Sequence, residues 1–558
     1  MTGKTLHTQQ GRGRSALISI IALCLLLSLP IFTVLWSIGA DSDGVWQHLA
    51  DTLLWSYIGQ SLTLMTGVGL LVLVLGVVPA WLVTMTRFPG SRVLEWALIL
   101  PLAMPAYIIA YTYTGMLDVT GPVQGFIRET FDLRFGDYWF PQIRSLGGAI
   151  VMLALVLYPY VYLLSRMAFL EQSVCVLEVS RTLGASPWRS FSRVAVPLAR
   201  PAIVAGLALV LMETLADYGT VQYFGLSTFT TGIFRTWFGM GSSTAAAQLS
   251  AVLMLFILVL IVTEQWSRNK ARFHHTSSKY SQLHPKRLAG WQSMAAMLFC
   301  ALPVLCGFLI PFLQLSWWAW DTRELVNFGD FSSLLYNSLR LALVAALITL
   351  VLGLGISYAK RLQPGMPMRT AVRVLSLGYA IPGTVIAVGV LIPFTFFDNT
   401  LDGWMRGQFD FSTGLLLSGT LGAVMFAYTV RFLPVSMNTL DAGLGKIKPT
   451  MDDVGRSMGL GNWQMLRRVH IPMLRGSLLT AALLVFVDVL KELPATLILR
   501  PFNFNTLAIR TYELANQERL TEAAASALMI VLAGIIPVII ISLSISASRP
   551  GHDSRIAD

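Results

Sequence analysis

The chain contains a polar, basic stretch, LEVSRTLGASPW at residues 177–188 followed by RVAVP at residues 193–197, between long apolar segments. The pattern recurs as DVGRSMG at residues 453–459, Trp463, and RVHIP at residues 468–472. The two copies align without a gap. One such segment is typical of a solvated amphipathic loop, but two in register indicate duplicated docking sites. The matched pairs are Glu178 and Asp453, Arg181 and Arg456, Gly184 and Gly459, Trp188 and Trp463, Arg193 and Arg468, and Pro197 and Pro472.

Each copy predicts a short helix, a turn and a second helix. The acid lies early, where the helix dipole favours it. Gly184 suits a helix end that needs a left-handed residue, and Pro187 suits the start of the next helix. Pro197 and Pro472 are expected where the chain re-enters the bilayer, because proline is tolerated at a helix start. The pattern predicts a unit stiff enough to transmit force.

Composition places most of the chain in a membrane. Of its 558 residues, 55% are hydrophobic and 12% are charged, whereas a soluble domain carries about a quarter charged residues. The net charge of +11 fits the basic cytoplasmic loops of a membrane protein. No basic domain indicates a nucleic-acid partner. The four cysteines lack metal-ligand spacing, so we expect small core residues, with no metal site and no cofactor bound by this chain.

The apolar segments predict an all-α polytopic membrane protein with about 12 transmembrane helices. The first segment is longer than the h-region of a signal peptide, about 7–15 residues, which favours an uncleaved helix over a cleaved signal. The predicted spans lie near residues 15–39, 61–84, 94–115, 147–168, 200–217, 248–265, 292–315, 338–359, 371–395, 412–433, 475–492 and 524–546.

A basic connector, residues 267–291, divides these spans into two halves of six, residues 1–266 and 292–558. Most of the 40 lysine and arginine residues fall on the side of the N-terminus, which predicts that both termini are cytoplasmic. The duplicated loops, about residues 172–198 and 447–473, then face the cytoplasm. Two halves of equal orientation predict a pseudo-two-fold along the membrane normal and a central pathway.

Matched glycines and prolines also lie within the spans, among them Gly76 with Gly353 and Pro105 with Pro382, together with Gly355 and Gly383. Close helix packing is the favoured interpretation, and a hinge is the alternative.

Charged residues follow each loop at spacings that place them on one helix face. They are Glu213 and Asp217, with Tyr218, in the first half and Asp488, Lys491 and Glu492 in the second. Ionisable groups near membrane depth usually face a cavity or a partner. Carboxylates in a translocation pathway would suit a hard, oxygen-seeking cation. The alternative is a structural salt-bridge set.

The chain lacks an ATP-binding loop of its own. Gly-Lys occurs only at residues 3–4 and 445–446, and neither fits G-x-x-x-x-G-K-S/T. No nucleophile–base pair or His/Cys cluster indicates an enzyme.

The duplicated segment resembles the EAA loop of binding-protein-dependent ABC importer permeases. That pattern has Glu-Ala-Ala, a glycine and a hydrophobic-x-hydrophobic-Pro ending. Here the alanines are replaced in both copies, and the second acid is Asp453. The resemblance implies a type I importer (MetI-like) transmembrane fold in a bacterial inner membrane. It also implies that each loop seats in one of two ABC ATPase subunits and that a periplasmic substrate-binding protein delivers the cargo.

At the subfamily level, residues 216–225, 489–497 and 500–503 are similar to the iron(III) permeases, which implies ferric ion as the cargo. Permeases for thiamine, phosphonate or polyamine remain alternatives. A secondary transporter is the rival from another class, but it would have no use for two matched cytoplasmic loops.

Overall fold

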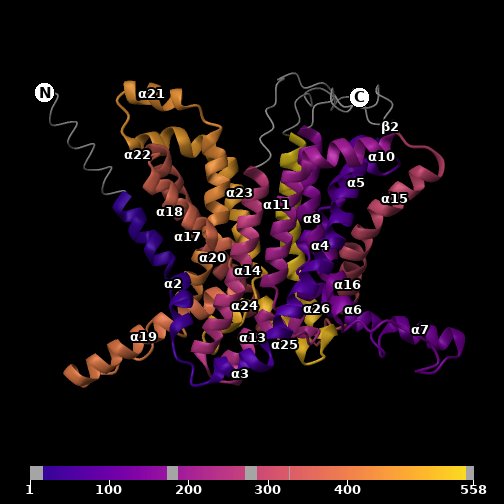
Figure 1. Cartoon of the computed structure of the whole chain (residues 1–558), viewed down its shortest axis with the longest axis horizontal. Helices are drawn as coiled ribbons and strands as arrows, with labels where there is room; N and C mark the ends of the chain where they lie inside the picture. Colours follow the sequence, from indigo (N-terminus) through magenta and orange to yellow (C-terminus); the bar gives the residue numbers. More distant parts are fainter. Residues whose placement is uncertain (1–16, 172–185, 270–285, 326, 548–558) are drawn as a thin grey trace. The chain divides into compact units, whose positions relative to one another are not determined.

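The computed structural model describes residues 17–171, 186–269, 286–325 and 327–547, which are mostly helical (Figure 1). Glu178, Arg181 and Gly184 lie outside the described residues. Within the described part of the chain, nine helices are long and apolar enough to cross a membrane, and two bent pairs raise the number to as many as eleven. The all-α polytopic fold is confirmed.

The chain forms two compact units. Unit 1 comprises Met1–Gln47, Ile233–Met254 and Phe328–Ile509, and unit 2 comprises His48–Gly232, Leu255–Asn327 and Arg510–Asp558. The elements of the first sequence half are Leu17–Leu27, α2 (Leu29–Trp36), α3 (Val45–Thr52), α4 (Leu54–Met85), β1 (Thr86–Arg87), α5 (Ser91–Ala97), α6 (Ala106–Leu117), α7 (Pro122–Phe131), α8 (Leu146–Glu171), α10 (Pro187–Ser190), α11 (Val196–Ala216), α12 (Gly219–Tyr223), α13 (Phe229–Phe234) and α14 (Ser243–Asn269). Those of the second are β2 (Lys286–Arg287), α15 (Gly290–Val304), α16 (Ile310–Asp321), α17 (Phe328–Leu362), α18 (Met366–Ser376), α19 (Gly383–Phe409), α20 (Leu421–Gly445), α21 (Pro449–Ser457), α22 (Asn462–Met465), α23 (Ile471–Leu490), α24 (Pro494–Leu499), α25 (Leu507–Asn516) and α26 (Leu520–Ala547).

Helices α4, α8 and α11 form the core of unit 2. Val161 of α8 lies against a glycine of each neighbour. A Cβ at Gly76 would lie 2.8 Å from the Val161 Cβ, and one at Gly206 would lie 2.9 Å from the Val161 Cα. These separations are shorter than side chains allow, so the close approach requires glycine. The packing interpretation of Gly76 is confirmed.

Helices α17, α20 and α23 pack together in the same way in unit 1. A Cβ at Gly353 would lie 3.1 Å from the Ser436 Cβ, and one at Gly443 would lie 2.5 Å from the Ser477 Oγ. Gly353, the partner of Gly76 in the repeat, is therefore also a packing residue. A Cβ at Gly355 would meet nothing within 4 Å, so packing does not account for that glycine.

The compact units interleave the two sequence halves. In unit 1, α2 from the first half packs on α19, and a Cβ at Gly389 would lie 2.4 Å from the Pro30 carbonyl oxygen. In unit 2, α16 and α26 from the second half pack on each other and on α6. The division into residues 1–266 and 292–558 describes the sequence repeat. That these halves are also separate domains of the fold stays a prediction.

Two predicted spans are interrupted at matched prolines. Ser91–Ala103 meets Ala106–Phe131 at 92° across Pro105, and α19 begins just after Pro382. Met104 and Ile381, which precede the prolines, are extended with ψ 114° and 128°, because the proline ring disfavours helical backbone in the residue before it. The predicted continuous spans near 94–115 and 371–395 are therefore wrong at these points.

The span predicted near residues 412–433 is placed too early, because its helix is α20 (Leu421–Gly445). Helix α20 is not among the candidate spans found in the described residues, and it contains Arg431 and several other polar residues. Apolar residues of the preceding loop, such as Leu415 and Leu416, produced the early prediction.

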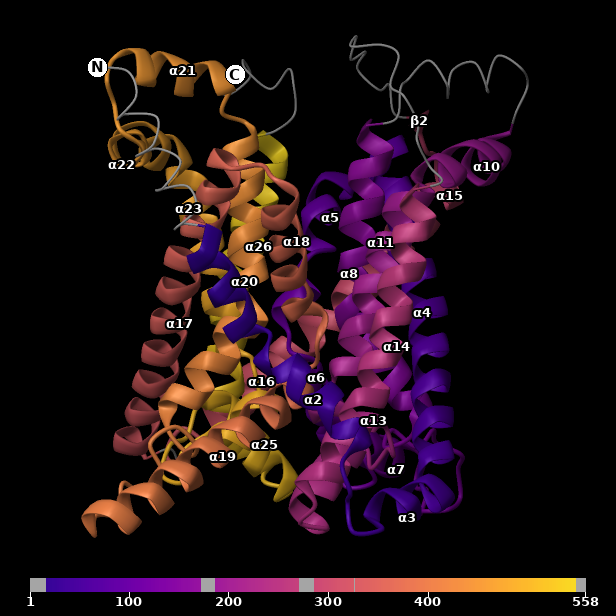
Figure 2. The ribbon, with the colours of Figure 1, turned by 60° about the vertical axis from the view of Figure 1, so that its left-hand side comes forward.

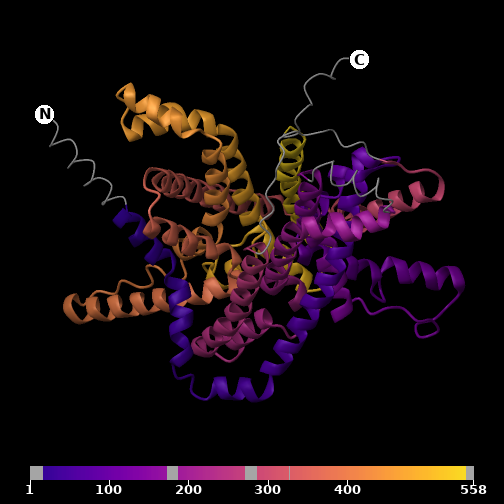
Figure 3. The same cartoon turned by 45° about the horizontal axis from the view of Figure 1, so that its top comes forward.

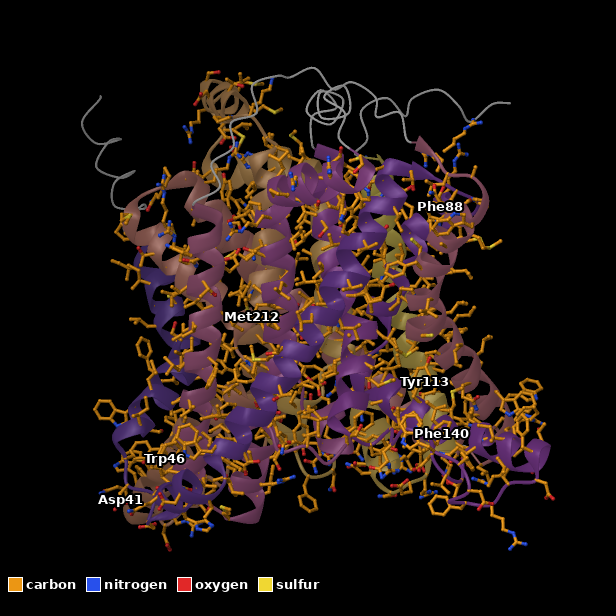
Figure 4. All side chains as sticks on the ribbon, turned by 45° about the vertical axis from the view of Figure 1, so that its right-hand side comes forward. Asp41, Trp46, Phe88, Tyr113, Phe140 and Met212 are labelled. Atoms are coloured by element: carbon orange, nitrogen blue, oxygen red, sulfur yellow. The ribbon has the colours of Figure 1, made fainter. Side chains whose placement is uncertain are left out.

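The polar ends of unit 2 are marked by short elements. Strands β1 and β2 pair in parallel, with Thr86 opposite Lys286, so the end of the basic connector lies against the end of α4. Phe88 lies near that end, whereas Tyr113 and Phe140 lie toward the other end (Figure 4). The Tyr113 hydroxyl donates to the carbonyl of Cys306 at 2.7 Å.

Candidate functional site

The second copy of the duplicated motif forms a helix, a turn and a second helix at one end of unit 1 (Figures 1 and 2). Helix α21 ends at Ser457, and Gly459, just after the C-cap Met458, has φ +78°. The Gly459 N–H donates to the Arg456 carbonyl at 3.0 Å, and the Leu460 N–H donates to the Gly455 carbonyl at 3.0 Å. These two bonds are those of a Schellman motif. The left-handed helix end predicted from the glycine is present in this copy.

Helix α21 packs directly on α22. A Cβ at Gly455 would lie 1.8 Å from the Met465 Cε, so this position admits only glycine without repacking. A Cβ at Gly459 would meet nothing within 4 Å. The two glycines therefore serve different purposes, because Gly455 provides space and Gly459 provides a backbone conformation.

A buried ionic network fixes α21 to the end of α17. The Asp452 carboxylate accepts from Arg361 Nε at 2.8 Å and lies 2.8 Å from His470 Nε2. Arg361 also donates to the carbonyls of Leu444 at 2.6 Å and Ile447 at 3.0 Å. Burial raises the pKa of Asp452, but the hydrogen bonds from Arg361 and His470 outweigh it and hold that pKa below its ordinary value.

Sequence reasoning missed this network. In the aligned first copy, Leu177 and Ala195 occupy the positions of Asp452 and His470. Because these residues differ between the two copies, a search for residues that agree between the copies cannot find the network. The remaining signal was the unusual pair of acids at residues 452–453, of which only Asp453 is matched.

The matched residues of the second copy lie on the outside. Trp463 is 69% exposed, and Met458 and Val454 of the same motif are also more than half exposed. Asp453 and Arg456 form a loose surface pair at 3.7 Å, and Pro472 is exposed. The motif thus presents an apolar and charged surface on a braced support.

The described part of the first copy has the same character. Trp188 is 70% exposed and lies 5.3 Å, between ring centroids, from Phe191, which in turn contacts Trp81 of α4. Pro197 is exposed.

Both copies continue into a membrane helix through a π-helical segment, Phe191–Ala195 in one and Leu466–His470 in the other. The helices run without a break from Trp188 to Ala216 and from Asn462 to Leu490. A proline two residues after each π-helical segment lacks an N–H, and the wider turn accommodates the missing bond. Each proline lies in the first turn of the α-helix that spans the membrane, as expected, but that helix is continuous with the second helix of the motif and has no separate start at the bilayer.

Two of the predicted pathway carboxylates cap short helices. Asp217 accepts from Thr220 Oγ1 at 3.0 Å and from the Val221 N–H at 3.1 Å, at the start of α12. Glu492 accepts from the Ala495 N–H at 3.1 Å and from Thr496 Oγ1 at 2.9 Å, at the start of α24. Such contacts satisfy free amide groups at a helix start.

Three of the other pathway residues have partners of their own. Lys491 lies 2.9 Å from Asp488, and the Tyr512 hydroxyl donates to that of Tyr218 at 3.3 Å. Glu213 is half-buried. In the described ranges, no three His, Cys, Asp or Glu residues are grouped to hold a metal ion. Glu213, Asp217 and Tyr218 belong to unit 2 and the rest to unit 1, so their convergence on one pathway stays a prediction.

Arg431 of α20 is a further charged residue that sequence reasoning missed. Its Nε and Nη1 atoms are buried, without a hydrogen-bond partner among the described residues. A Cβ at Gly383 would lie 2.9 Å from Arg431 Nη1 and 2.5 Å from Glu492 Oε1. Because Gly383 has no side chain, the Arg431 and Glu492 side chains can occupy the space next to its Cα. The aligned residue of the first half is Val156, so the repeat comparison could not detect it.

Comparison with known proteins agrees with the repeat. A family model described as binding-protein-dependent transport system inner membrane component matches residues 72–268 and 350–558. The chain is 27% identical over 489 residues to the Fe(3+)-transport system permease protein FbpB 2 of Haemophilus influenzae, covering 87% of this chain and 89% of the relative. It is 23% identical over 469 residues to the ferric transport system permease protein FbpB of Actinobacillus pleuropneumoniae, covering 79% of this chain and 64% of the relative. The molybdenum transport system permease protein ModB of Escherichia coli is 26% identical over 197 residues, covering 34% of this chain and 83% of the relative.

Proposed function

The chain belongs to the family of inner membrane components of binding-protein-dependent transport systems, and from this premise we propose that it forms the membrane pathway of an ATP-driven importer. A separate ATPase supplies the energy, since neither Gly-Lys pair of this chain fits the phosphate-binding pattern G-x-x-x-x-G-K-S/T. A periplasmic binding protein delivers the cargo. Both termini face the cytoplasm, as the distribution of lysine and arginine favours.

The observation that carries the coupling proposal is the form of the second motif copy. Its outer surface is exposed and apolar, while Arg361, Asp452 and His470 brace it from behind. Because α22, the second helix of the motif, is continuous with α23, a push on the motif moves a membrane span. A surface that received force without such a brace would deform locally. The residues proposed to contact two ATPase subunits are Glu178, Arg181, Gly184, Trp188, Pro197, Asp453, Arg456, Gly459, Trp463 and Pro472.

Ferric iron is the proposed cargo. The two ferric permeases match over 87% and 79% of the chain, whereas the molybdenum permease matches over 34%. The Asp217 and Glu492 carboxylates stabilise the starts of α12 and α24. Glu213 and the Asp488–Lys491 pair are therefore the pathway residues to test. A pathway needs weak, releasable contacts with its cargo, so a closed metal site is not required. Thiamine, phosphonate and polyamine are the alternative cargoes.

Reconstitution tests the proposal. Proteoliposomes that contain this chain, a candidate ATPase and a candidate binding protein should take up labelled ferric ion only when ATP is present. Gly459→Val should abolish or uncouple this uptake, because a left-handed backbone costs an L-residue about 1–2 kcal/mol and a β-branched residue more.

Gly461→Val is the matched control. Gly461 lies in the same turn, and a Cβ there, like one at Gly459, would meet nothing within 4 Å, but the φ of Gly461 is −72°. This variant should retain uptake. Normal transport by Gly459→Val would contradict the coupling role, and uptake without any ATPase would indicate a secondary transporter instead.

A further inference from the structure

Two outer segments share a sequence pattern that the proposed transport function does not explain. Residues 125–132 read GFIRETFD and residues 403–410 read GWMRGQFD. Each is preceded by Asp-x-Thr, at residues 118–120 and 398–400. Both copies have glycine, an aromatic residue, arginine, phenylalanine and aspartate at the same spacing. The segments lie one in each sequence half, like the duplicated loop motif.

The two segments also share a backbone form. One is α7 and the other is the C-terminal part of α19, and each helix ends at the matched aspartate. Asp132 has φ +50° and Asp410 has φ +52°, a left-handed conformation that is uncommon outside glycine. The N–H of each aspartate donates to the carbonyl of the matched arginine, Arg128 or Arg406. We name residues 118–145 the first arm and residues 398–420 the second arm.

Polar contacts within the second arm fold its return segment onto its helix. The Asp398 carboxylate is 1% exposed and accepts from the Ser418 N–H at 2.8 Å and the Ser418 Oγ at 2.6 Å. Asp402 accepts from Ser412 Oγ at 2.7 Å and pairs with Arg406 Nε at 2.6 Å. The arm is therefore a folded hairpin whose acids are engaged internally.

The first arm is folded by different residues to the same effect. Gln124 Nε2 donates to the Leu117 carbonyl at 2.8 Å, and the Tyr138 hydroxyl donates to Gln124 Oε1 at 2.7 Å. Arg128 Nη1 donates to the Tyr138 hydroxyl at 3.3 Å. The matched arginine is thus used inside its own arm in both cases.

Large apolar side chains cover the outside of both arms. Each of these residues is more than half exposed: Phe126, Phe131, Phe135 and Trp139 in the first arm, and Trp404, Phe409, Phe411 and Leu415 in the second. A water-soluble surface rarely exposes so many large apolar groups together without a partner.

We propose that both arms lie in the membrane interface, with their aromatic side chains at the level of the lipid headgroups. Helix α19 is itself a candidate span and continues without a break into the second arm. In the first arm, α7 follows the span helix α6 after a turn at residues 118–121. The root of each arm is therefore at the bilayer surface. The second arm projects away from the helices of its own unit (Figures 1 and 3), where lipid is the neighbour. Tryptophan and phenylalanine with arginine are the residues of such interfacial helices.

Within unit 1 the second arm lies at the end opposite α21 and α22 (Figure 2). The leaflet contacted is therefore the one away from the duplicated motif. The arms would fix the depth of the helices from which they extend, because moving an arm out of the interface would expose its aromatic residues to water.

Spin labels on the full chain test this placement. A chain with Cys24, Cys175, Cys300 and Cys306 replaced by alanine receives one cysteine at Phe131 or Phe409 and is placed in vesicles of phosphatidylethanolamine and phosphatidylglycerol. The matched controls are Thr130→Cys and Gln408→Cys, which are exposed neighbours on the same helices. Accessibility to oxygen and to a water-soluble nickel chelate is measured by power saturation.

Labels at 131 and 409 should show a several-fold higher ratio of oxygen to nickel accessibility than labels at 130 and 408, with no partner protein present. Equal access of the nickel chelate to all four labels would overturn the proposal. Shielding that arises only when a binding protein is added would also overturn it and would identify the arms as a protein-docking surface. The readout needs no transport activity, so it is independent of the proposed cargo and ATPase.

Discussion

Replacement of Arg361 by methionine should release α21 from the rest of unit 1. Arg361, at the end of α17, donates to three acceptors: the Asp452 carboxylate of α21 and the carbonyls of Leu444 and Ile447 just before α21. Methionine keeps most of the aliphatic volume of the side chain but removes every donor. The Asp452 carboxylate would then keep only its contact with His470 Nε2.

The magnitude follows from the burial of the pair. The Arg361 and Asp452 side chains are 15% and 12% exposed. Removing one partner of a buried ion pair costs about 3–5 kcal/mol, because the other charge is left uncompensated. Water reaches this end of the unit more easily than a core, so we take the low end, about 3 kcal/mol. At tenfold per 1.4 kcal/mol, local opening of α21 should become on the order of a hundredfold more frequent.

Amide hydrogen exchange in nanodiscs measures this opening directly. The matched control is Arg456→Met, which removes a cation from the same motif. Arg456 and Asp453 are 56% and 72% exposed and 3.7 Å apart, so that pair should contribute about 0–1 kcal/mol. The double variant Arg361→Met with Asp452→Leu should recover part of the protection, because it also removes the uncompensated carboxylate.

Equal exchange in α21 for Arg361→Met and Arg456→Met would refute the reasoning. The brace would then carry no more free energy than a surface pair. Slower exchange in the Arg361 variant would refute it as well, because the buried pair would then be net destabilising against an apolar side chain.

Two further predictions concern other contacts. Gly383→Ala should lower thermal stability in detergent and reduce transport, because the new Cβ would lie 2.5 Å from Glu492 Oε1 and 2.9 Å from Arg431 Nη1; Gly355→Ala, with nothing within 4 Å, should be neutral, and equal effects would contradict the packing argument. The bidentate hydrogen bonds from Arg144, each 2.8 Å, hold the pKa of Glu518 below its ordinary value of 4.5, so the contact is stabilising above that pH and is lost as the pH falls through the lower folded value. Protease resistance between α25 and α26 should therefore be constant from neutral pH down to about 4.5 and decrease below it, whereas Glu518→Gln should be equally sensitive at every pH.

Sequence patterns predicted those parts of the fold that depend on local chemistry. Gly459 ends a helix in the left-handed conformation because no other residue type adopts it as easily, and that property is visible in one letter of the sequence. The packing role of Gly76 and Gly353 was also predictable from the sequence, since a glycine repeated at matched positions in two apolar segments indicates close helix packing.

The parts that sequence patterns missed depend on contacts between distant segments. The Arg361–Asp452–His470 network joins residues from three elements of one half and has no counterpart in the other, so comparing the copies concealed it. The helix breaks before Pro105 and Pro382 require the backbone of Met104 and Ile381 to be extended. Apolar composition continues across both breaks and therefore does not reveal them. The apolar loop before α20 was mistaken for the start of a span because hydropathy does not record that Asp398 folds this loop back onto α19.

The interleaving of the two compact units affects the order in which the protein is made. The helix near Pro30 leaves the ribosome long before Gly389, the residue on which it packs. It must wait in the bilayer without its partner while most of the chain is synthesised. Likewise, unit 2 begins at His48 but lacks α26 until the second half has been made. Neither unit can be completed from one sequence half: unit 1 must wait until the segment ending at Ile509 has been made, and unit 2 until α26 has been made.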